Sequence, residues 1–101
     1  MKKIILTDKA PAPIGPYSQG VEINGLLFFS GQIAIDPAEG RIVATDVEGQ
    51  TRQVLANIAA LLKEAGLTAE NVVKTTVFIK NIADFSKVNA LYAGMFGGDA
   101  P

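Results

Sequence analysis

Residues 21–29 read VEINGLLFF and place an Asn-Gly pair between two short apolar runs. Both central residues of a type I′ turn need a positive φ, which asparagine and glycine tolerate best. The stretch therefore predicts a β-hairpin with Asn24 and Gly25 at its turn. One more strand is expected upstream, over the apolar residues 3–6.

Residues 10–20, APAPIGPYSQG, separate that upstream strand from the hairpin. Pro11, Pro13 and Pro16 fix φ, lack an NH donor and push the residues before them toward extended backbone. The segment is therefore expected to be a stiff loop that presents Tyr17. It is either a functional loop or a simple cover for the edge of the sheet.

The hairpin continues into residues 30–33, SGQI, where Gly31 interrupts a strand-like sequence. Such a glycine marks a bulge or a place where another group approaches the backbone closely. Residues 36–40, DPAEG, read as a turn that leads to a short apolar run at 41–43.

A long amphipathic helix is expected to begin at residue 45, because Thr45 and Glu48 have the spacing of a capping box. Its apolar positions recur through Ala65, and Gly66 is a typical C-terminal stop. Residues 72–80, VVKTTVFIK, then alternate as in a strand with at least one buried face.

A second helix follows, with apolar residues from Phe85 to Phe96, either Asp84 or Asn81 as its cap and Gly97 as its stop. This order of elements predicts one α+β domain over residues 1–101, a two-layer sandwich with two helices on one face of a mixed β-sheet. So few strands cover two apolar helices poorly. Either a neighbouring chain completes the sheet, or the polypeptide is longer than these residues.

The composition excludes several classes of chemistry. The chain has no cysteine and no histidine, which rules out disulfides, thiol nucleophiles, Cys/His zinc sites and an imidazole base. The formal net charge is −1 and the nine Lys and Arg residues are scattered, which argues against a nucleic-acid or membrane partner. The apolar run at the N-terminus is too short for a signal peptide, so a cytoplasmic location is expected.

Five pieces of the sequence, taken together and in order, resemble the Rid/YjgF family of reactive-intermediate (enamine/imine) deaminases. They are APIGPYSQ at 12–19, SGQI at 30–33, QTRQVLANI at 50–58, VKTTVFI at 73–79 and FSKVNALY at 85–92. The resemblance implies a chorismate-mutase-like fold, a homotrimer with clefts at the subunit interfaces, and no metal or organic cofactor. It also implies hydrolysis of 2-iminobutanoate and 2-iminopropanoate, or their enamine tautomers, to 2-keto acids and ammonia.

The resemblance also implies the roles of particular residues. Tyr17 is similar to the catalytic tyrosine of the cleft, whose hydroxyl orients water or the substrate nitrogen, while Ser30, Gly31 and Asn89 are similar to substrate-binding residues. The alternatives are structural. Tyr17 covers the sheet edge, Ser30 bonds to the backbone, Gly31 forms a bulge, and Asn89 makes a helix-packing hydrogen bond from a partly buried position.

Family members continue past the position of Pro101 with an arginine that binds the substrate carboxylate and a glutamate that activates water. Neither has a counterpart within these residues, because Arg52 and Lys74 fit solvated positions better than clamps. We therefore expect a longer chain to be a deaminase and a chain that ends at Pro101 to be inactive. The alternatives are a non-catalytic trimer that binds a 2-keto acid for regulation and, less in keeping with the charge, an endoribonuclease.

Overall fold

The structure is a computed structural model that describes all of residues 1–101. An antiparallel sheet contains β1 (Lys3–Ile5), β2 (Gly20–Ile23) and β3 (Leu26–Phe29) in that order, and β4 (Ile35–Asp36) pairs with β5 (Arg41–Ile42). The two α-helices are α1 (Val47–Glu64) and α2 (Phe85–Phe96). Short 3-10 turns lie at η1 (Ala69–Asn71) and η2 (Ile82–Asp84).

The predicted hairpin is confirmed. Ile23 pairs with Leu26 across the turn, and Asn24 and Gly25 have φ values of 50° and 77°. Positive φ at both positions is what a type I′ turn requires. Local turn chemistry thus sets the register of β2 and β3.

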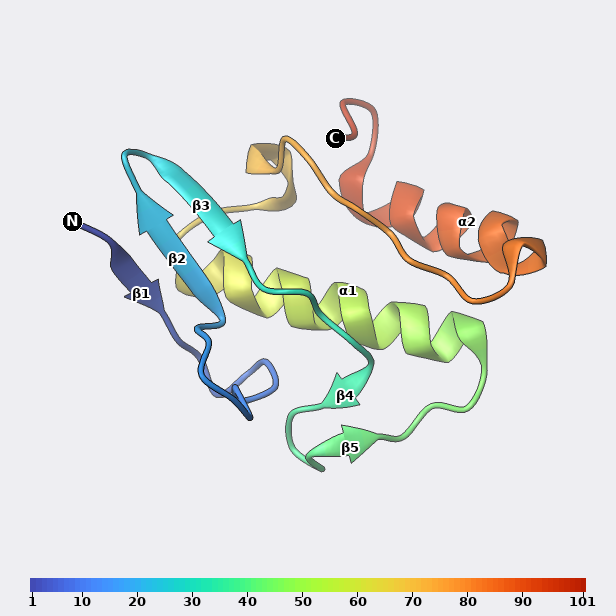
Figure 1. The fold of residues 1–101 in the computed structure, drawn as a ribbon. Helices are drawn as coiled ribbons and strands as arrows, with labels where there is room; N and C mark the ends of the chain where they lie inside the picture. The colour runs from blue at the N-terminus through green and yellow to red at the C-terminus, as the bar shows by residue number, and fades with distance from the viewer.

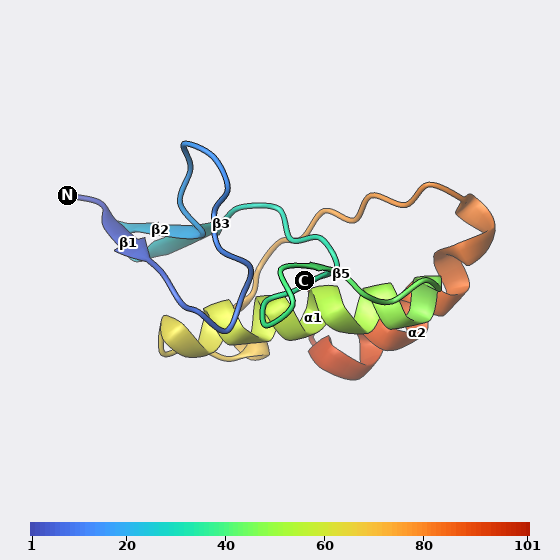
Figure 2. The same ribbon diagram turned by 90° about the horizontal axis from the view of Figure 1, so that it is seen from below.

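The elements form two layers, as predicted for an α+β sandwich. Figure 2 shows β1 to β3 and the extended segment 72–80 on one side, and α1 and α2 together on the other. All recorded strand pairs are antiparallel. The parallel pairing that a mixed sheet needs is not formed by these residues.

Helix α1 begins at Val47, one residue later than a cap at Thr45 predicts, and the predicted capping box of Thr45 and Glu48 is wrong. The N-cap is Asp46, whose side chain makes no capping hydrogen bond. The third helical residue is then Gly49, which has no side chain to complete a capping box. Instead, the Glu48 carboxylate oxygen Oε2 lies 4.0 Å from the guanidinium nitrogen Nη2 of Arg52, one turn along the helix.

The C-terminal stop of α1 is confirmed at Gly66, which has a φ of 75°. Its NH donates to the carbonyl of Lys63 at 3.0 Å, and the NH of Leu67 donates to that of Leu62 at 2.8 Å. These two bonds define a Schellman motif, which satisfies carbonyls that the helix leaves open.

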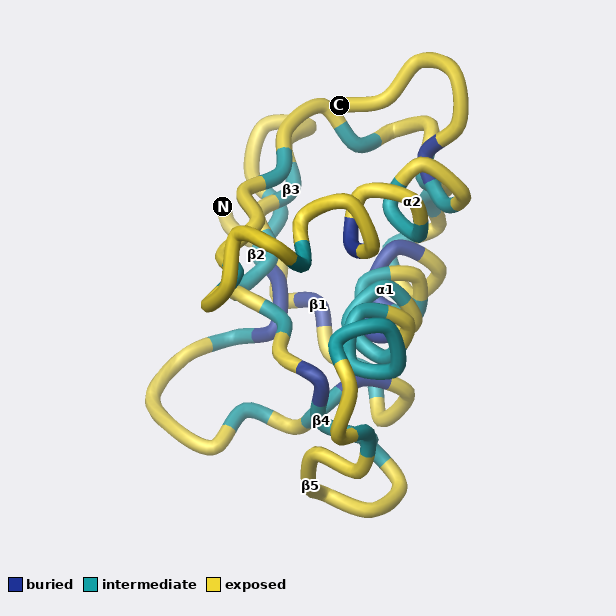
Figure 3. Tube along the Cα trace, turned by 90° about the vertical axis from the view of Figure 1, so that its right-hand side faces the viewer, coloured by how far each residue is buried: buried dark blue, intermediate teal, exposed yellow.

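The core lies between the layers and is thin. Only 10 of the 101 residues are buried, and α1 contributes Leu61 and Leu62 to the apolar ones. Figure 3 shows the buried stretches where the sheet layer and the helices face each other. The apolar core residues are Ile5, Ala10, Ala34, Leu61, Leu62, Val88 and Phe96.

The strand predicted over residues 72–80 is not formed. The segment runs extended beside α2 (Figure 1), but residues 73–80 make no backbone hydrogen bond. A strand needs the backbone of a neighbour, and none of the described residues lies in that position. A 2.6 Å hydrogen bond between the hydroxyls of Thr75 and Tyr92 joins the segment to α2. The expected buried face is largely open, with Val73 83% exposed.

Helix α2 starts after Asp84, which occupies the N-cap position without a side-chain hydrogen bond. The Asn81 side chain instead accepts a hydrogen bond from the Ala83 NH and caps η2. Gly97, with a φ of 67°, ends the helix as predicted.

Two glycine substitutions test this account of α1. Gly66→Ala should lower the free energy of unfolding by about 1 kcal/mol, because a Cβ is strained at positive φ. Gly94→Ala is the matched control. It lies inside α2 with open space around its Cβ position, and it should raise the free energy by about 0.5–1 kcal/mol. Urea unfolding measures both, and shifts of the same sign would contradict the assignment.

Candidate functional site

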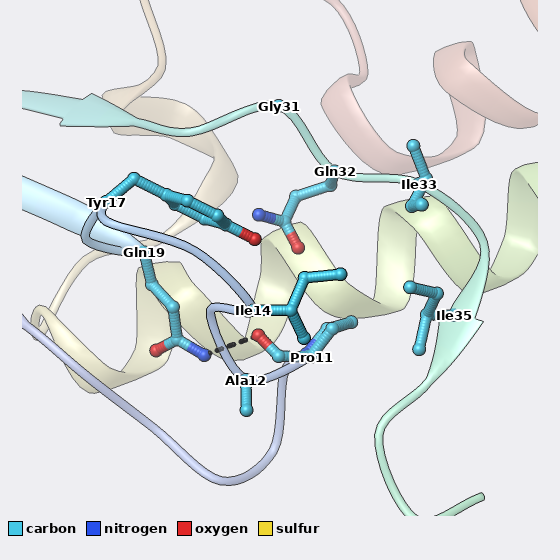
Figure 4. A pocket seen from close by; sticks show the side chains of 9 residues that line it. All are labelled: Pro11, Ala12, Ile14, Tyr17, Gln19, Gly31, Gln32, Ile33 and Ile35. Carbon is cyan, nitrogen blue, oxygen red and sulfur yellow. Dashed lines mark hydrogen bonds between the residues drawn. The ribbon is translucent and has the colours of Figure 1, made fainter. Parts of the chain in front are cut away.

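A pocket of about 120 Å³ lies where the proline-rich loop meets the segment after β3. It joins the two stretches that the sequence singles out, residues 10–20 and 30–33. Figure 4 shows its lining side chains converging from both walls. They are Pro11, Ala12, Ile14, Tyr17, Gln19, Gly31, Gln32, Ile33 and Ile35.

Gln19 holds the loop wall of the pocket in place. Its side chain is 2% exposed. The amide Nε2 donates to the carbonyls of Pro11 at 2.8 Å and Thr7 at 3.0 Å, and Oε1 accepts from the Thr7 NH at 2.7 Å. Prolines supply no NH groups to fix such a loop, so a buried side-chain amide takes the place of backbone pairing.

Asn57 of α1 holds the opposite wall. Its side chain is 1% exposed, and Nδ2 donates to the carbonyls of Ile33 at 3.1 Å and Ile35 at 3.0 Å. Both isoleucines line the pocket, whereas Asn57 lies behind them.

Two polar end groups enter the otherwise apolar pocket. The ring of Tyr17 is half exposed, and its hydroxyl makes no hydrogen bond within the chain. Gln32 donates through Nε2 to the Ser30 carbonyl at 3.1 Å, which leaves Oε1 as its free acceptor. Figure 4 shows both groups directed into the pocket. The pocket thus offers one donor-acceptor hydroxyl and one acceptor to a small polar ligand.

Gly31 contributes its backbone. No atom lies within 4 Å of the position that a Cβ would take, so packing within the chain does not require glycine there. The NH groups of Gly31 and Gln32 form none of the hydrogen bonds within the chain. A bare backbone with free donors beside a pocket can receive a carboxylate or carbonyl oxygen.

Ser30 and Asn89 do not join this pocket. The Ser30 hydroxyl donates to the Ser18 carbonyl at 2.6 Å, as its structural alternative predicts. Asn89 is exposed on α2, so the predicted partial burial is wrong: its side of the helix has little covering it in a single chain. It lines a separate shallow hollow with Val77, Phe85, Val88 and Tyr92.

No charged side chain lines the pocket. Arg52 is exposed on α1 beside Glu48, and Lys74 is exposed on the extended segment, as the solvated interpretation of both residues predicts. No group of three or more His, Cys, Asp or Glu residues is placed to hold a metal ion. Neither helix combines the length and hydrophobicity that crossing a membrane requires.

Sequence reasoning missed the roles of Gln19, Gln32 and Asn57. Asn57 had a usable signal, because it sits at helical spacing from Val54 and Leu61 on the apolar face of α1. A polar side chain on a buried face needs hydrogen-bond partners. The identity of those partners, 22 and 24 residues away, carried no signal in the sequence.

The comparisons with known proteins agree on one family. A family model described as Endoribonuclease L-PSP matches residues 7–101. A RutC family protein of Pyrococcus horikoshii is 50% identical over 101 residues, which cover 100% of this chain and 80% of the relative. A 2-iminobutanoate/2-iminopropanoate deaminase of Salmonella typhimurium is 50% identical over 96 residues, covering 95% of this chain and 74% of the relative.

Among solved structures, a protein of unknown function of the conserved Rid family from Yersinia pestis superposes with a TM-score of 0.94. It is 53% identical, and the match covers 97% of this chain and 78% of that chain. The similarity therefore extends over both walls of the pocket.

The role of Gln19 is tested by Gln19→Leu, which leaves several buried backbone groups without partners. The free energy of unfolding should fall by about 1–3 kcal/mol, and the amides of residues 7–12 should exchange faster with solvent. Gln50→Leu is the matched control, because Gln50 makes a single bond, to the Ala44 carbonyl. Urea unfolding and hydrogen exchange measure both, and equal losses would contradict the role given to Gln19.

Proposed function

The chain belongs to the YjgF/Rid family, and from that premise we propose that it is a 2-iminobutanoate/2-iminopropanoate deaminase. The observation that carries the proposal is the 50% identity to the Salmonella deaminase across 95% of this chain. The reaction adds water to the C=N carbon of the imino acid. The resulting carbinolamine then loses ammonia and leaves a 2-keto acid.

The pocket residues suit parts of this chemistry. Ile14, Ile33 and Ile35 offer apolar contact to a short aliphatic chain. The free NH groups of Gly31 and Gln32 can bind a carboxylate or a developing anion. The Tyr17 hydroxyl can orient the attacking water or polarise the C=N bond.

Two tasks need groups that do not line the pocket. A cation for the substrate carboxylate and a base for the water are absent from the lining residues. We propose that residues following the matched region in longer relatives, or a neighbouring subunit, supply them. In that arrangement Asn89 remains a proposed substrate-binding residue at a cleft between chains. Ser30 would support the site through its bond to the Ser18 carbonyl.

The activity is tested with two proteins. One is the 101-residue chain, and the other is a chimera that joins the C-terminal residues of the Salmonella relative after Pro101. The chimera should release 2-ketobutyrate from enzymatically generated 2-iminobutanoate, and the 101-residue chain should match the buffer blank. A chimera that folds but gives no turnover would contradict the deaminase proposal.

Tyr17→Phe in the chimera separates chemistry from folding. Loss of one positioned hydroxyl should lower kcat on the order of 100-fold. Tyr92→Phe is the control, because that hydroxyl already bonds Thr75, and it should leave kcat within about threefold. Equal effects of the two substitutions would remove Tyr17 from the mechanism.

We also propose that the protein assembles as a homotrimer and acts in the cytoplasm. Exposed apolar side chains on the extended segment and near η2, such as Phe78 at 92% and Ile82 at 79% exposure, support association. Sedimentation equilibrium of the chimera should give three times its chain mass. A monomer at micromolar concentration would contradict the trimer.

The 101-residue chain and the chimera also distinguish two other functions. A regulatory 2-keto acid binder would bind 2-ketobutyrate in calorimetry and show no imine turnover. An endoribonuclease, the activity in the name of the family model, would require RNA affinity that falls steeply with salt. The scattered Lys and Arg residues argue against the latter.

A further inference from the structure

We propose that Asn57 is a positioning residue that sets the shape of the substrate pocket from behind its wall. The proposal rests on the proposed function, because it takes this pocket as the place where the aliphatic part of the substrate binds. Asn57 itself is not among the lining residues. Any effect on the reaction must therefore pass through the segment that it holds.

The geometry of the Asn57 amide is fully determined by its partners. One NH₂ group bridges the two carbonyls of Ile33 and Ile35, at 3.1 and 3.0 Å. On the other side, Oδ1 accepts from Nε2 of Gln53 at 2.9 Å, one turn earlier on α1. The two carbonyls fix which end of the amide faces the wall, because a carbonyl oxygen accepts hydrogen bonds and cannot donate.

The wall has little else to hold it. Residues 30–34 lie outside any strand, and β4 is only two residues long. Ala34, buried at 6% exposure, sits between the two isoleucines against the interior. With both flanking carbonyls bonded to α1, the Ile33 and Ile35 side chains are presented to the pocket at a defined distance from the helix.

The two walls of the pocket therefore depend on two separate buried amides. Gln19 holds the loop and also touches the pocket, so its substitution mixes contact and positioning. Asn57 only positions. It is the cleaner probe of whether the pocket must be held in shape to bind the substrate, because its substitution removes no lining side chain.

The test compares Asn57→Leu with Leu61→Val in the chimera that carries the C-terminal residues of the Salmonella relative, the protein for which turnover is expected. Leu has nearly the shape of Asn and cannot donate, whereas Leu61→Val loosens the fully buried residue one turn further on the same helix. Asn57→Leu should raise KM about tenfold with kcat within about threefold after correction for the folded fraction. Leu61→Val should lower the melting temperature and leave KM unchanged. Equal KM values for the two variants at matched folded fraction would overturn the proposal.

Two further substitutions separate the donors from the acceptor. Asn57→Asp keeps the acceptor for Gln53 and loses both donors, so it should raise KM at least as much as Asn57→Leu. Gln53→Met removes the bond to Oδ1 and keeps the bridge to the wall, so KM should rise less than about threefold. A wild-type KM for Asn57→Asp would contradict the bridging role.

A measurement without turnover keeps the two proposals distinguishable. Amide hydrogen exchange of residues 32–36 should be about tenfold faster in Asn57→Leu than in Leu61→Val at equal stability. If the chimera without further substitution folds but shows no turnover, the deaminase proposal fails, while the exchange result still decides whether Asn57 positions the wall. Equal exchange in both variants would overturn the positioning role whatever the activity.

Discussion

Buried side-chain amides hold two irregular segments of this protein in place by bonding their backbone groups, as a neighbouring strand would in a larger sheet. The proline-rich loop and the segment after β3 do not pair as strands. Three residues of the loop lack an NH group, and the one backbone bond between the two segments joins the Ser30 NH to the Gln19 carbonyl. Gln19 and Asn57 fill that need with bonds to six backbone groups. No buried side-chain polar atom is left unpaired. Since an unpaired buried amide is costly, these bonds allow a pocket to exist between two irregular segments.

The parts of the fold that the sequence predicts well are those with local causes. Asn24 and Gly25 bend the hairpin through their own φ preferences, and Gly66 ends α1 for the same reason. The segment 72–80 fails as a strand because strand formation depends on a distant neighbour that alternation cannot reveal. The start of α1 was misplaced since Asp46 competes with Thr45 for the N-cap, and both residue types favour that position.

The sequence pointed to two residues that line the candidate site, but not to the buried side chains that hold its walls in place. Tyr17 and Gly31 lie in one pocket, but only the family resemblance linked two stretches separated by a hairpin. Gln19 and Asn57 donate to backbone carbonyls. Every residue has such a carbonyl, so the sequence does not reveal which of them is the partner. Asn89 was expected to be partly buried because it shares one side of α2 with apolar residues, but helical spacing does not reveal whether anything covers that side.

The polar and apolar groups that line the pocket limit what a single chain can do under the proposed function. Its pocket offers apolar contact, one hydroxyl, one amide oxygen and free backbone donors, with no charged side chain among the lining residues. Such a site distinguishes ligands by size and shape and binds a carboxylate weakly, because a neutral donor is worth about half a charged one. The hollow that Asn89 lines is almost wholly apolar and open, and Val77 beside it is 51% exposed. A partner chain that covered this face would bury apolar surface, and under the proposed function the same chain could supply the cation that the substrate carboxylate needs. Association and carboxylate recognition would then be coupled, and the assembly rather than the single chain would be the unit that carries out the reaction.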